Sequence, residues 1–209
     1  MKRLVNRVQA LSEAIVGQSP WMNGHSIRVM EYAVAAGLEL GLSGEPLEAL
    51  KLAGLLHDIG KIGTCSCVLE KRGQLTSKEF ELVKLHPAHG ADLLLQTETL
   101  SRVALVIRHH HERYDGTGYP DKLAGEEIPF LSRVLYVADA FDSMTADRPY
   151  RKAPGRDYAV AELRRCSGSQ FDPLVVEAFL KIMEDFPPAC NRDFLSRIGE
   201  DPVAVSSLI

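Results

Sequence analysis

The sequence has no long apolar run and no strong excess of charge, and these absences exclude several classes of protein. No segment approaches the roughly 20 apolar residues of a membrane-spanning helix, and residues 1–14 are too polar for a signal peptide. The formal net charge is only −4. We therefore expect no attraction to a nucleic-acid polymer or a membrane surface, and we predict a cytoplasmic protein.

Cysteine is also scarce. The chain of 209 residues has four cysteines, Cys65, Cys67, Cys166 and Cys190. The Cys65-Ser66-Cys67 spacing does not fit the C-x-x-C pattern of metal knuckles and redox motifs, so we expect all four to be reduced thiols. Hydrophobic residues make up 45% of the chain, which is enough for one substantial apolar core.

The alternating pattern of a half-buried strand is lacking, whereas apolar residues recur at three- to four-residue spacing. This pattern predicts an all-α fold, a single helical bundle. Thr76 and Glu79 form a capping-box pattern. The predicted helices are one after His25 with its apolar face on Ile27, Met30, Val34 and Leu38, then Leu47 to Ile59 with Gly60 as its end, Thr76 towards His86, another from Pro87, one through Val103 and Ile107, Leu131 to Met144, and Leu174 to Glu184 after the N-cap Asp172.

The helical segments divide the chain into three parts. We predict a helical extension over residues 1–19, a main domain over 20–185 and a tail over 186–209. Residues 112–129 are rich in glycine and proline and form a long loop, and loops of that length in a compact domain tend to be functional.

Histidine is confined to one part of the chain, since all seven lie between positions 25 and 111. Several stand beside a carboxylate, a lysine or a second histidine, and a single aspartate follows later in an apolar segment. Imidazoles and carboxylates together are the ligands of a hydrolytic iron, manganese or zinc pair. In a helical bundle such ligands converge from facing helices. The pattern predicts a dinuclear metal site between helices, with candidate ligands His25, His57, Asp58, His86, His110, His111 and Asp139.

Several long motifs, in order, resemble the HD-GYP domains of the HD phosphohydrolase superfamily. The resemblance covers about residues 20–185. Its motifs are HDIGK at 57–61, HPAHGADLL at 86–94, HHERYDGTGYPDKLAGEEIP at 110–129 with Gly118-Tyr119-Pro120 as the GYP, SRVLYVADAFDSMTADRPYR at 132–151 and GSQFDP at 168–173.

The resemblance implies a bacterial phosphodiesterase that opens cyclic di-GMP to linear pGpG, and further to GMP in some members, by attack of a hydroxide that bridges two metals. The metals would be divalent, iron or manganese, with zinc, nickel and cobalt as alternatives. By the same resemblance one metal would take His25, His57, Asp58 and Asp139, and the other would take Asp58, His86, His110 and His111, with Asp58 bridging.

The resemblance also implies substrate contacts. Lys61 would act with Asp58 in catalysis by contacting the scissile phosphate, and Tyr119 would stand beside the site. Arg148 and Arg151 would bind the phosphates of cyclic di-GMP. Tyr119 has packing as its alternative, and the two arginines have a solvated helix end as theirs.

Other polar groups near the motifs carry weaker expectations. His89 and His109 match no metal position, and we expect them in supporting or surface roles. Glu112 follows the histidine pair and is expected to hydrogen-bond a ligand imidazole.

The chain departs from the family pattern in two places. Some members carry a glutamate four residues before the first metal histidine, which supports a third metal, and Trp21 occupies that position here. We therefore predict two metals. Where the family often reads I-P-D, the chain has Thr64-Cys65-Ser66, which removes no predicted ligand.

The context of the domain and its substrate stay open. Only 24 residues precede His25, fewer than a receiver or sensor domain needs, so the chain is either a stand-alone enzyme or an excised output domain. Helical spacing of apolar residues near the start favours packing on the core or a homodimer. Two alternatives to a cyclic di-GMP phosphodiesterase remain: hydrolysis of another cyclic dinucleotide such as cyclic GMP-AMP, or an effector that binds a dinucleotide or a protein without turnover.

Overall fold

A computed structural model describes residues 24–69, 71, 73–96, 98–147 and 152–185. Over these residues the chain is helical, with no strand and one isolated bridge between Ser167 and Phe171. The all-α prediction is confirmed. Some sequence-based predictions lie outside the described residues: the extension over 1–19, Trp21, the arginines Arg148 and Arg151, the tail over 186–209 and Cys190.

The helices are short and follow one another closely along the chain. The α-helices are α2 (His25–Glu39), α3 (Gly44–Leu56), α4 (Ser66–Leu69), α5 (Ser77–Val83), α6 (His86–Leu95), α7 (Ser101–Arg108), α8 (Phe130–Thr145), α9 (Arg156–Arg165) and α10 (Pro173–Asp185). The 3-10 helices are η2 (Ile59–Gly63), η3 (Glu98–Leu100) and η4 (Gly125–Glu127). None of the helices in this described part of the chain is both long and apolar enough to cross a membrane.

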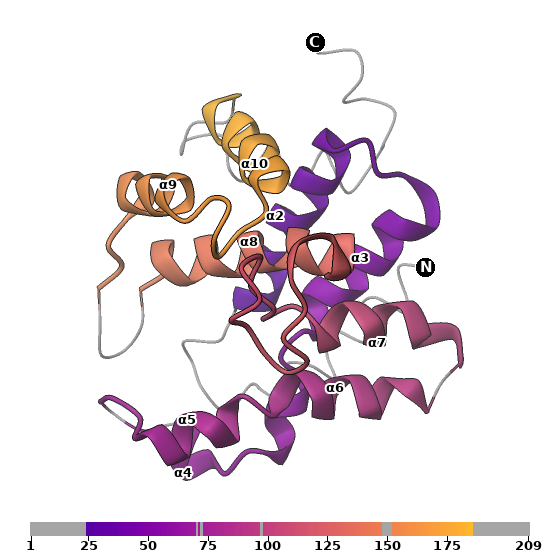
Figure 1. Cartoon of the computed structure of the whole chain (residues 1–209), viewed down its shortest axis with the longest axis vertical. Helices are drawn as coiled ribbons and strands as arrows, with labels where there is room; N and C mark the ends of the chain where they lie inside the picture. The colour runs from indigo at the N-terminus through magenta and orange to yellow at the C-terminus, as the bar shows by residue number, and fades with distance from the viewer. Residues whose placement is uncertain (1–23, 70, 72, 97, 148–151, 186–209) are drawn as a thin grey trace.

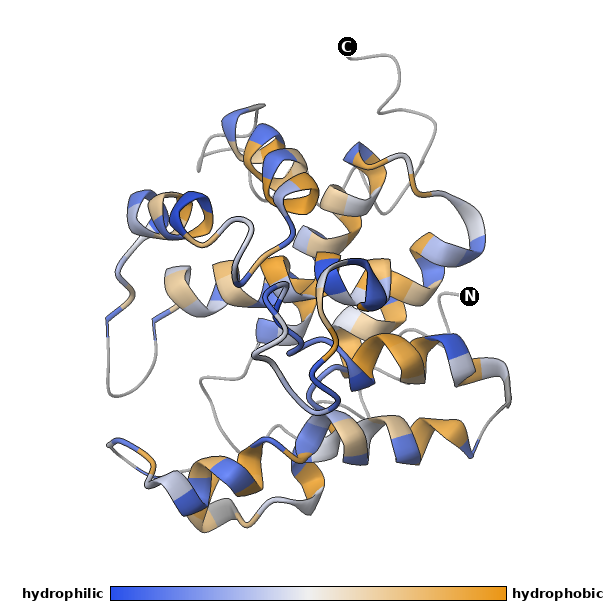
Figure 2. Ribbon diagram, in the orientation of Figure 1, coloured by the Kyte–Doolittle hydropathy of each residue, from blue (hydrophilic) through white to orange (hydrophobic). Residues whose placement is uncertain are grey.

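Helix α8 crosses the middle of the molecule (Figure 1). Helices α2, α3, α7, α9 and α10 all pack against it, and α6 packs on α7 and η2. Helices α4 and α5 lie at the lower left of Figure 1, away from α8. Along α9 and α10, hydrophobic and hydrophilic residues are mixed in Figure 2, as expected of helices with one face turned to a core. The site described below lies where these packed layers meet.

The buried face of α2 is broader than the sequence pattern predicted. Val34 is buried, but Ile27, Met30 and Leu38 are only half-buried. The core positions are instead Val29, Tyr32, Ala33, Ala35 and Ala36. The prediction was wrong on this point because α2 is contacted by α3, α8 and α10, so small residues on several sides are buried.

Local helix signals in the sequence are confirmed. The hydroxyl of Thr76 accepts a hydrogen bond from the Glu79 amide at 3.3 Å, and the Thr76 amide donates to the Glu79 carboxylate at 2.6 Å. At the start of α10, the carboxylate of Asp172 accepts from the Leu174 amide at 2.8 Å. These signals are readable because each motif supplies its own hydrogen-bond partner within a few residues.

The sequence analysis misplaced the end of α3 and did not predict α9. Helix α3 ends at Leu56 rather than Ile59, and the chain turns there into η2. A Cβ on Gly60 would lie 1.9 Å from the His86 carbonyl oxygen. Gly60 is therefore required for the close approach of η2 to α6 rather than to end a helix. Helix α9 had no recognised signal in the sequence.

The prediction of four reduced thiols was wrong for one pair. Cys65 and Cys67 are joined by a disulfide, with their Cα atoms 5.3 Å apart. Cys65 directly precedes α4 and Cys67 is its second residue, so their Cα atoms lie within the usual range for a disulfide, which the spacing rule did not consider. Cys166 is free and buried.

Candidate metal centre

The predicted ligands lie mostly at helix ends. His25 is the first residue of α2, His86 is the first residue of α6, and His57 directly follows α3. His110 lies just beyond α7. A helix end can direct adjacent side chains to one point, because its backbone is free to leave the helical path. Only Asp139, within α8, projects from the middle of a helix.

These residues gather into two neighbouring groups. The first group is His86, His110 and His111, and the second group is His25, His57 and Asp58. In each group one possible ligand atom per residue lies within 4.8 Å of the others. Asp139 joins the second group, since its Oδ1 lies 3.4 Å from His25 Nε2 and 3.9 Å from His57 Nε2. The structure thus brings all seven candidates together, and their role as ligands stays a prediction.

Asp58 belongs to the second group and also faces the first. Its Oδ1 is 3.5 Å from His86 Nε2, and its Oδ2 is 3.6 Å from His57 Nε2. The two oxygens of one carboxylate therefore face different groups, which is the arrangement that a bridging ligand needs. Lys61 Nζ also contacts Oδ2, at 2.6 Å.

Three imidazoles are oriented by backbone carbonyls. The Nδ1 atoms of His57, His86 and His110 lie 2.9, 2.7 and 2.6 Å from the carbonyl oxygens three residues earlier. A carbonyl accepts only, so Nδ1 carries the proton and Nε2 keeps its lone pair for a ligand. The three acceptors are Gly54, Val83 and Ile107.

His25 is oriented differently, by side chains that the sequence analysis missed. Its Nδ1 lies 2.7 Å from Asp142 Oδ2, and Arg28 contacts both oxygens of Asp142 through Nε at 2.5 Å and Nη2 at 3.0 Å. Burial alone would lower the pKa of His25, but the bond to Asp142 and the charges of Asp139 and Asp58 raise it. The sequence contained a signal for Arg28 and Asp142. Arg28 follows His25 by three residues and Asp142 follows Asp139 by three residues, so each pair lies on one face of its helix.

Burial favours the neutral form of His86, His110 and His111. It lowers the pKa of His86 to about 4 and that of His111 to about 3. Burial and the neighbouring histidines hold the pKa of His110 well below its usual value. Burial would raise the pKa of Asp58, yet the positive charge of Lys61 and the histidines hold it well below its usual value. Neutral imidazoles around charged carboxylates form a site suited to cations.

One buried atom supports the fit of a metal to this site. Among the described residues, His57 Nε2 is buried without a hydrogen-bond partner. A buried polar nitrogen costs free energy unless something binds it. Because its lone pair faces the carboxylates of Asp58 and Asp139, a cation between these groups would satisfy all three.

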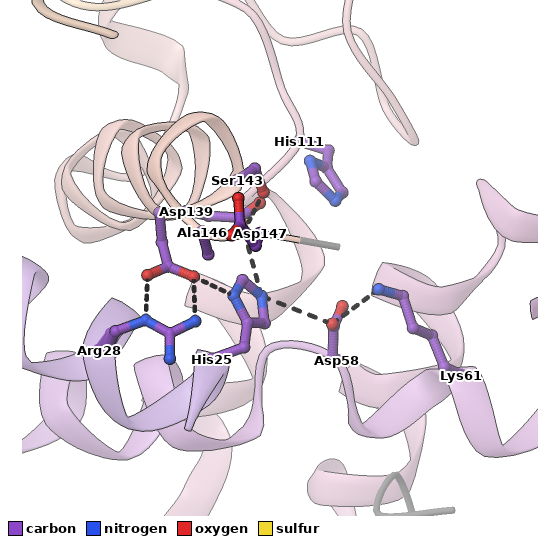
Figure 3. Close-up of a pocket in the computed structure, with 10 residues that line it drawn as sticks. His25, Arg28, Asp58, Lys61, His111, Asp139, Ser143, Ala146 and Asp147 are labelled. Atoms are coloured by element: carbon purple, nitrogen blue, oxygen red, sulfur yellow. Dashed lines mark hydrogen bonds and ion pairs between the residues drawn. The ribbon is translucent and has the colours of Figure 1, made fainter. Parts of the chain in front are cut away.

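A cavity of about 190 Å³ opens over the second group. Figure 3 shows His25, Asp58 and Lys61 in a row across it, with His111 on another side. Asp147 also lines the cavity, and it is the last described residue before Arg148 and Arg151. The lining residues are His25, Arg28, Asp58, Lys61, His111, Asp139, Asp142, Ser143, Ala146 and Asp147.

The predicted loop folds back onto the centre. The Tyr119 amide donates to the His111 carbonyl at 3.3 Å, and the Tyr119 ring centroid is 5.0 Å from that of His111. A Cβ on Gly118 would lie 2.3 Å from the Arg113 nitrogen, so only glycine permits this contact. The Tyr119–Pro120 peptide bond is cis. Tyr119 therefore lies beside the site, as expected.

Glu112 does not have the predicted role. Its Oε1 accepts a hydrogen bond from the Asp121 amide at 2.6 Å and so holds the loop rather than an imidazole. The Ile107 carbonyl already orients His110, and the Glu112 carboxylate bonds the loop backbone instead. His109 contacts Asp121 Oδ2 at 3.0 Å, and His89 is exposed, so neither belongs to the two groups.

Comparison with known proteins places this geometry in a family. The family model of the HD domain matches residues 9–175. The chain belongs to the HD domain family. The resemblance to its HD-GYP members is confirmed by relatives such as a cyclic di-GMP phosphodiesterase of Pseudomonas aeruginosa, which is 42% identical over 78% of this chain and 39% of its own length.

Other HD domain relatives differ in the substrate that their names give. A cyclic di-GMP phosphodiesterase response regulator of Xanthomonas campestris is 41% identical over 79% of this chain and 44% of its own length. A 3'3'-cGAMP-specific phosphodiesterase of Vibrio cholerae is 35% identical over 86% of this chain and 39% of its own length. The chain thus spans less than half the length of these curated relatives.

Solved structures share the fold. A cyclic GMP-AMP specific phosphodiesterase of V. cholerae aligns with a TM-score of 0.69 at 24% identity, over 94% of this chain and 53% of that chain. A HDG"Y"P protein of Bdellovibrio bacteriovorus aligns with a TM-score of 0.64 at 21% identity, over 87% of this chain and 60% of that chain. At such identities the likeness supports the HD fold alone.

Proposed function

We propose that this chain is a metal-dependent phosphodiesterase that hydrolyses cyclic di-GMP to linear pGpG, with GMP as the product of any further cut. The observation that carries the proposal is Asp58, whose two oxygens face two groups of possible ligands. The names of the relatives that are about 40% identical support the substrate.

The ligands divide into two sets that share Asp58. Two divalent cations, iron or manganese, would supply Lewis-acid charge and activate water near neutral pH. The residues themselves hold lone pairs towards the centre through Nδ1 hydrogen bonds and burial. One set is His25, His57, Asp58 and Asp139, and the other is Asp58, His86, His110 and His111.

Lys61 has the position for a phosphate contact. Its side chain lines the cavity and is 22% exposed, and Asp58 fixes its ammonium 2.6 Å away. An ammonium there would neutralise a non-bridging oxygen of the scissile phosphate as negative charge grows towards the transition state. We propose Tyr119 as a neighbour of the bound substrate, and Arg148 and Arg151 as contacts of its second phosphate.

A second substrate, cyclic GMP-AMP, is consistent with one observation. Relatives named as 3'3'-cGAMP-specific phosphodiesterases are 35% and 34% identical to this chain, close to the identity of the others. Both substrates contain guanine and two phosphates, so the same centre would serve either. The choice between them depends on the bases.

The test is turnover of a panel of cyclic dinucleotides by protein reconstituted with Mn²⁺ or Fe²⁺, with products identified by mass. We expect two metals per chain and fastest turnover of cyclic di-GMP. Asp58→Ala should abolish turnover and lower metal content, whereas Asp92→Ala, which removes an exposed carboxylate from α6, should change neither. Preference for cyclic GMP-AMP would favour the second substrate, and binding without turnover would identify an effector instead.

A further inference from the structure

Helix α5 leaves a large aromatic side chain exposed beside the centre. No residue of this helix is buried, and Phe80 is 45% exposed. Core packing therefore does not account for an aromatic residue at this position. An exposed aromatic ring has a face on which a nucleotide base can stack.

Phe80 is the outer end of a row of rings and charge that begins at the centre. The Tyr119 ring stands 5.0 Å from the His111 ring. Lys84 Nζ lies 5.8 Å from the Tyr119 centroid and 4.9 Å from the Phe80 centroid. The lysine ammonium thus lies between two aromatic rings, with Glu81 as a hydrogen-bond partner at 2.7 Å.

The cavity is too small to enclose a whole cyclic dinucleotide. A cavity of about 190 Å³ is smaller than the roughly 300–1,000 Å³ of pockets that enclose a small ligand. If a phosphate of a cyclic dinucleotide is held by Lys61 and the ligand groups, the adjoining base has to lie on the rim. His111 lines the cavity, and the row from it through Tyr119 and Lys84 to Phe80 leads outward.

We propose that Phe80, Lys84 and Tyr119 form a binding site for a purine base, a proposal that rests on the phosphodiesterase function above. An aromatic ring stacks on the face of any base. Guanine presents two acceptors, O6 and N7, on one edge, whereas adenine presents one acceptor and a donor. The Lys84 ammonium has donors only, so the site favours guanine over adenine.

Steady-state kinetics with three variants test this proposal. Phe80→Ala and Lys84→Met should each raise KM for cyclic di-GMP roughly five- to a hundredfold, the range expected for a lost stacking contact. Lys84→Met should also reduce the preference for cyclic di-GMP over cyclic di-AMP. Leu82→Ala, which shortens an exposed side chain on the same helix, is the matched control and should leave KM unchanged.

A diester without a purine separates base binding from general damage. All three variants should hydrolyse bis(p-nitrophenyl) phosphate within about twofold of the unmodified protein. An unchanged KM for cyclic di-GMP in both Phe80→Ala and Lys84→Met overturns the purine site, as does an equal loss with both substrates. If the unmodified protein turns over no cyclic dinucleotide, the proposed function fails as well.

The hydrogen bonds of His25 carry a second, independent inference. Three of the other candidate ligands, His57, His86 and His110, end or follow a helical turn whose carbonyls accept from their Nδ1 atoms. His25 begins α2, so no earlier turn of that helix supplies a carbonyl. Asp142 takes this role, and Arg28 holds both of its oxygens.

We infer that Asp142 and Arg28 are positioning residues that direct His25 Nε2 towards the metal set of Asp58 and Asp139. The Asp142 side chain is only 1% exposed, so the carboxylate is held within the fold. His25 Nε2 lies 3.4 Å from Asp139 Oδ1 and 4.0 Å from Asp58 Oδ2. This inference rests on the two-metal centre and is independent of which substrate is cut.

The chain contains a second trio of the same chemistry that serves as a control. Asp121 contacts His109 at 3.0 Å and Arg108 at 2.7 and 2.9 Å. The remaining nitrogen of His109 lies 3.0 Å from the Leu105 carbonyl, which leaves no ring nitrogen for a ligand. In both trios an aspartate bonds a histidine and an arginine. The trios differ in whether the histidine keeps a ring nitrogen that can bind a metal.

Metal affinity, measured by chelator competition and elemental analysis, tests the positioning role. Asp142→Asn should weaken one of two metals roughly 10- to 100-fold, as expected when the partner of a ligating histidine is lost. Arg28→Lys should weaken it less, and Asp121→Asn should leave both metals unchanged. Two metals of unchanged affinity in Asp142→Asn, or in Arg28→Met if that variant does not fold, overturn the inference. Fewer than two metals in the unmodified protein would instead count against the proposed centre.

Discussion

At the scale of single residues, the candidate ligands were predictable from the sequence and the groups that orient them were not. Histidines are rare, so their clustering beside carboxylates is informative in one dimension. Asp142 and Arg28 are ordinary members of amphipathic helices until α2 and α8 pack together, and His25 and Asp142 are 117 residues apart. The prediction for Glu112 was wrong for a related reason, because a backbone carbonyl already accepts the hydrogen bond from the His110 ring.

Glu31 gives a residue-scale prediction on the same face of α2. Burial raises its pKa to about 7 despite the nearby charge of Arg28. A folded-state pKa above the unfolded value makes folding weaker as pH rises from about 4.5 through 7. Glu31→Gln should therefore raise the thermal midpoint above pH 7, by about 1–3 °C after allowance for solvent screening, and not below pH 4.5.

Thermal melts at pH 4.5, 6 and 8 check the sign of that effect. Glu126→Gln removes an exposed carboxylate from the loop and should show no such dependence. A Glu31→Gln midpoint that rises equally at all three pH values would contradict the assigned cause.

At the scale of elements, the sequence predicted what each segment decides alone. The capping box at Thr76 and the N-cap at Asp172 form within their own turns, so the starts of α5 and α10 were predictable. The end of α3 depends instead on how closely η2 approaches α6, which no local motif encodes. The HDIGK segment is therefore shaped by a tertiary contact at Gly60.

Gly60→Ala tests that contact. The added methyl would lie 1.9 Å from the His86 carbonyl oxygen and 2.5 Å from the Gly90 nitrogen, so η2 or α6 has to move. Overpacking of this kind costs about 1–3 kcal/mol, and it should also weaken metal binding, because Asp58 and His86 lie on either side of the contact.

Gly63→Ala is the matched control in the same 3-10 helix. Its methyl would lie 3.4 Å from the His89 ring, an ordinary contact distance. Urea unfolding with bound metal determined in parallel should show a clear loss for Gly60→Ala alone. Equal stability of the two variants would show that the contact relaxes without cost.

At the scale of the whole molecule, five helices or their ends converge on one polar centre inside an apolar core. The all-α class and the long loop were predictable from composition and periodicity. The histidine and carboxylate pattern predicted one shared site, whereas the division of its residues into two sets that share Asp58 came from the family resemblance, because spacing alone does not determine which helix ends meet. Convergence also collects neutral histidines in one buried place, which makes the stability of the fold depend on pH.

The metal-free protein should lose stability as pH falls below about 6.5. Burial holds the pKa of His86 near 4 and that of His111 near 3, so the unfolded chain binds protons at these sites before the folded one does. Unfolding is therefore favoured as pH falls from 6.5 towards 4, and stability is regained above 6.5. The raised pKa of His25 acts in the opposite direction but is one group against several.

Thermal melts of chelator-treated protein at pH 7.5, 6, 5 and 4.5 measure this dependence. His86→Gln should flatten it, because one buried titrating ring is removed, whereas His89→Gln changes an exposed ring and should keep the full slope. Excess Mn²⁺ at pH 7.5 should raise the midpoint, because binding to the folded state adds about 2.7 kcal/mol to the free energy of unfolding at a hundredfold excess over Kd. Midpoints that are flat with pH in the metal-free protein would mean that the centre opens to solvent once its cations are gone.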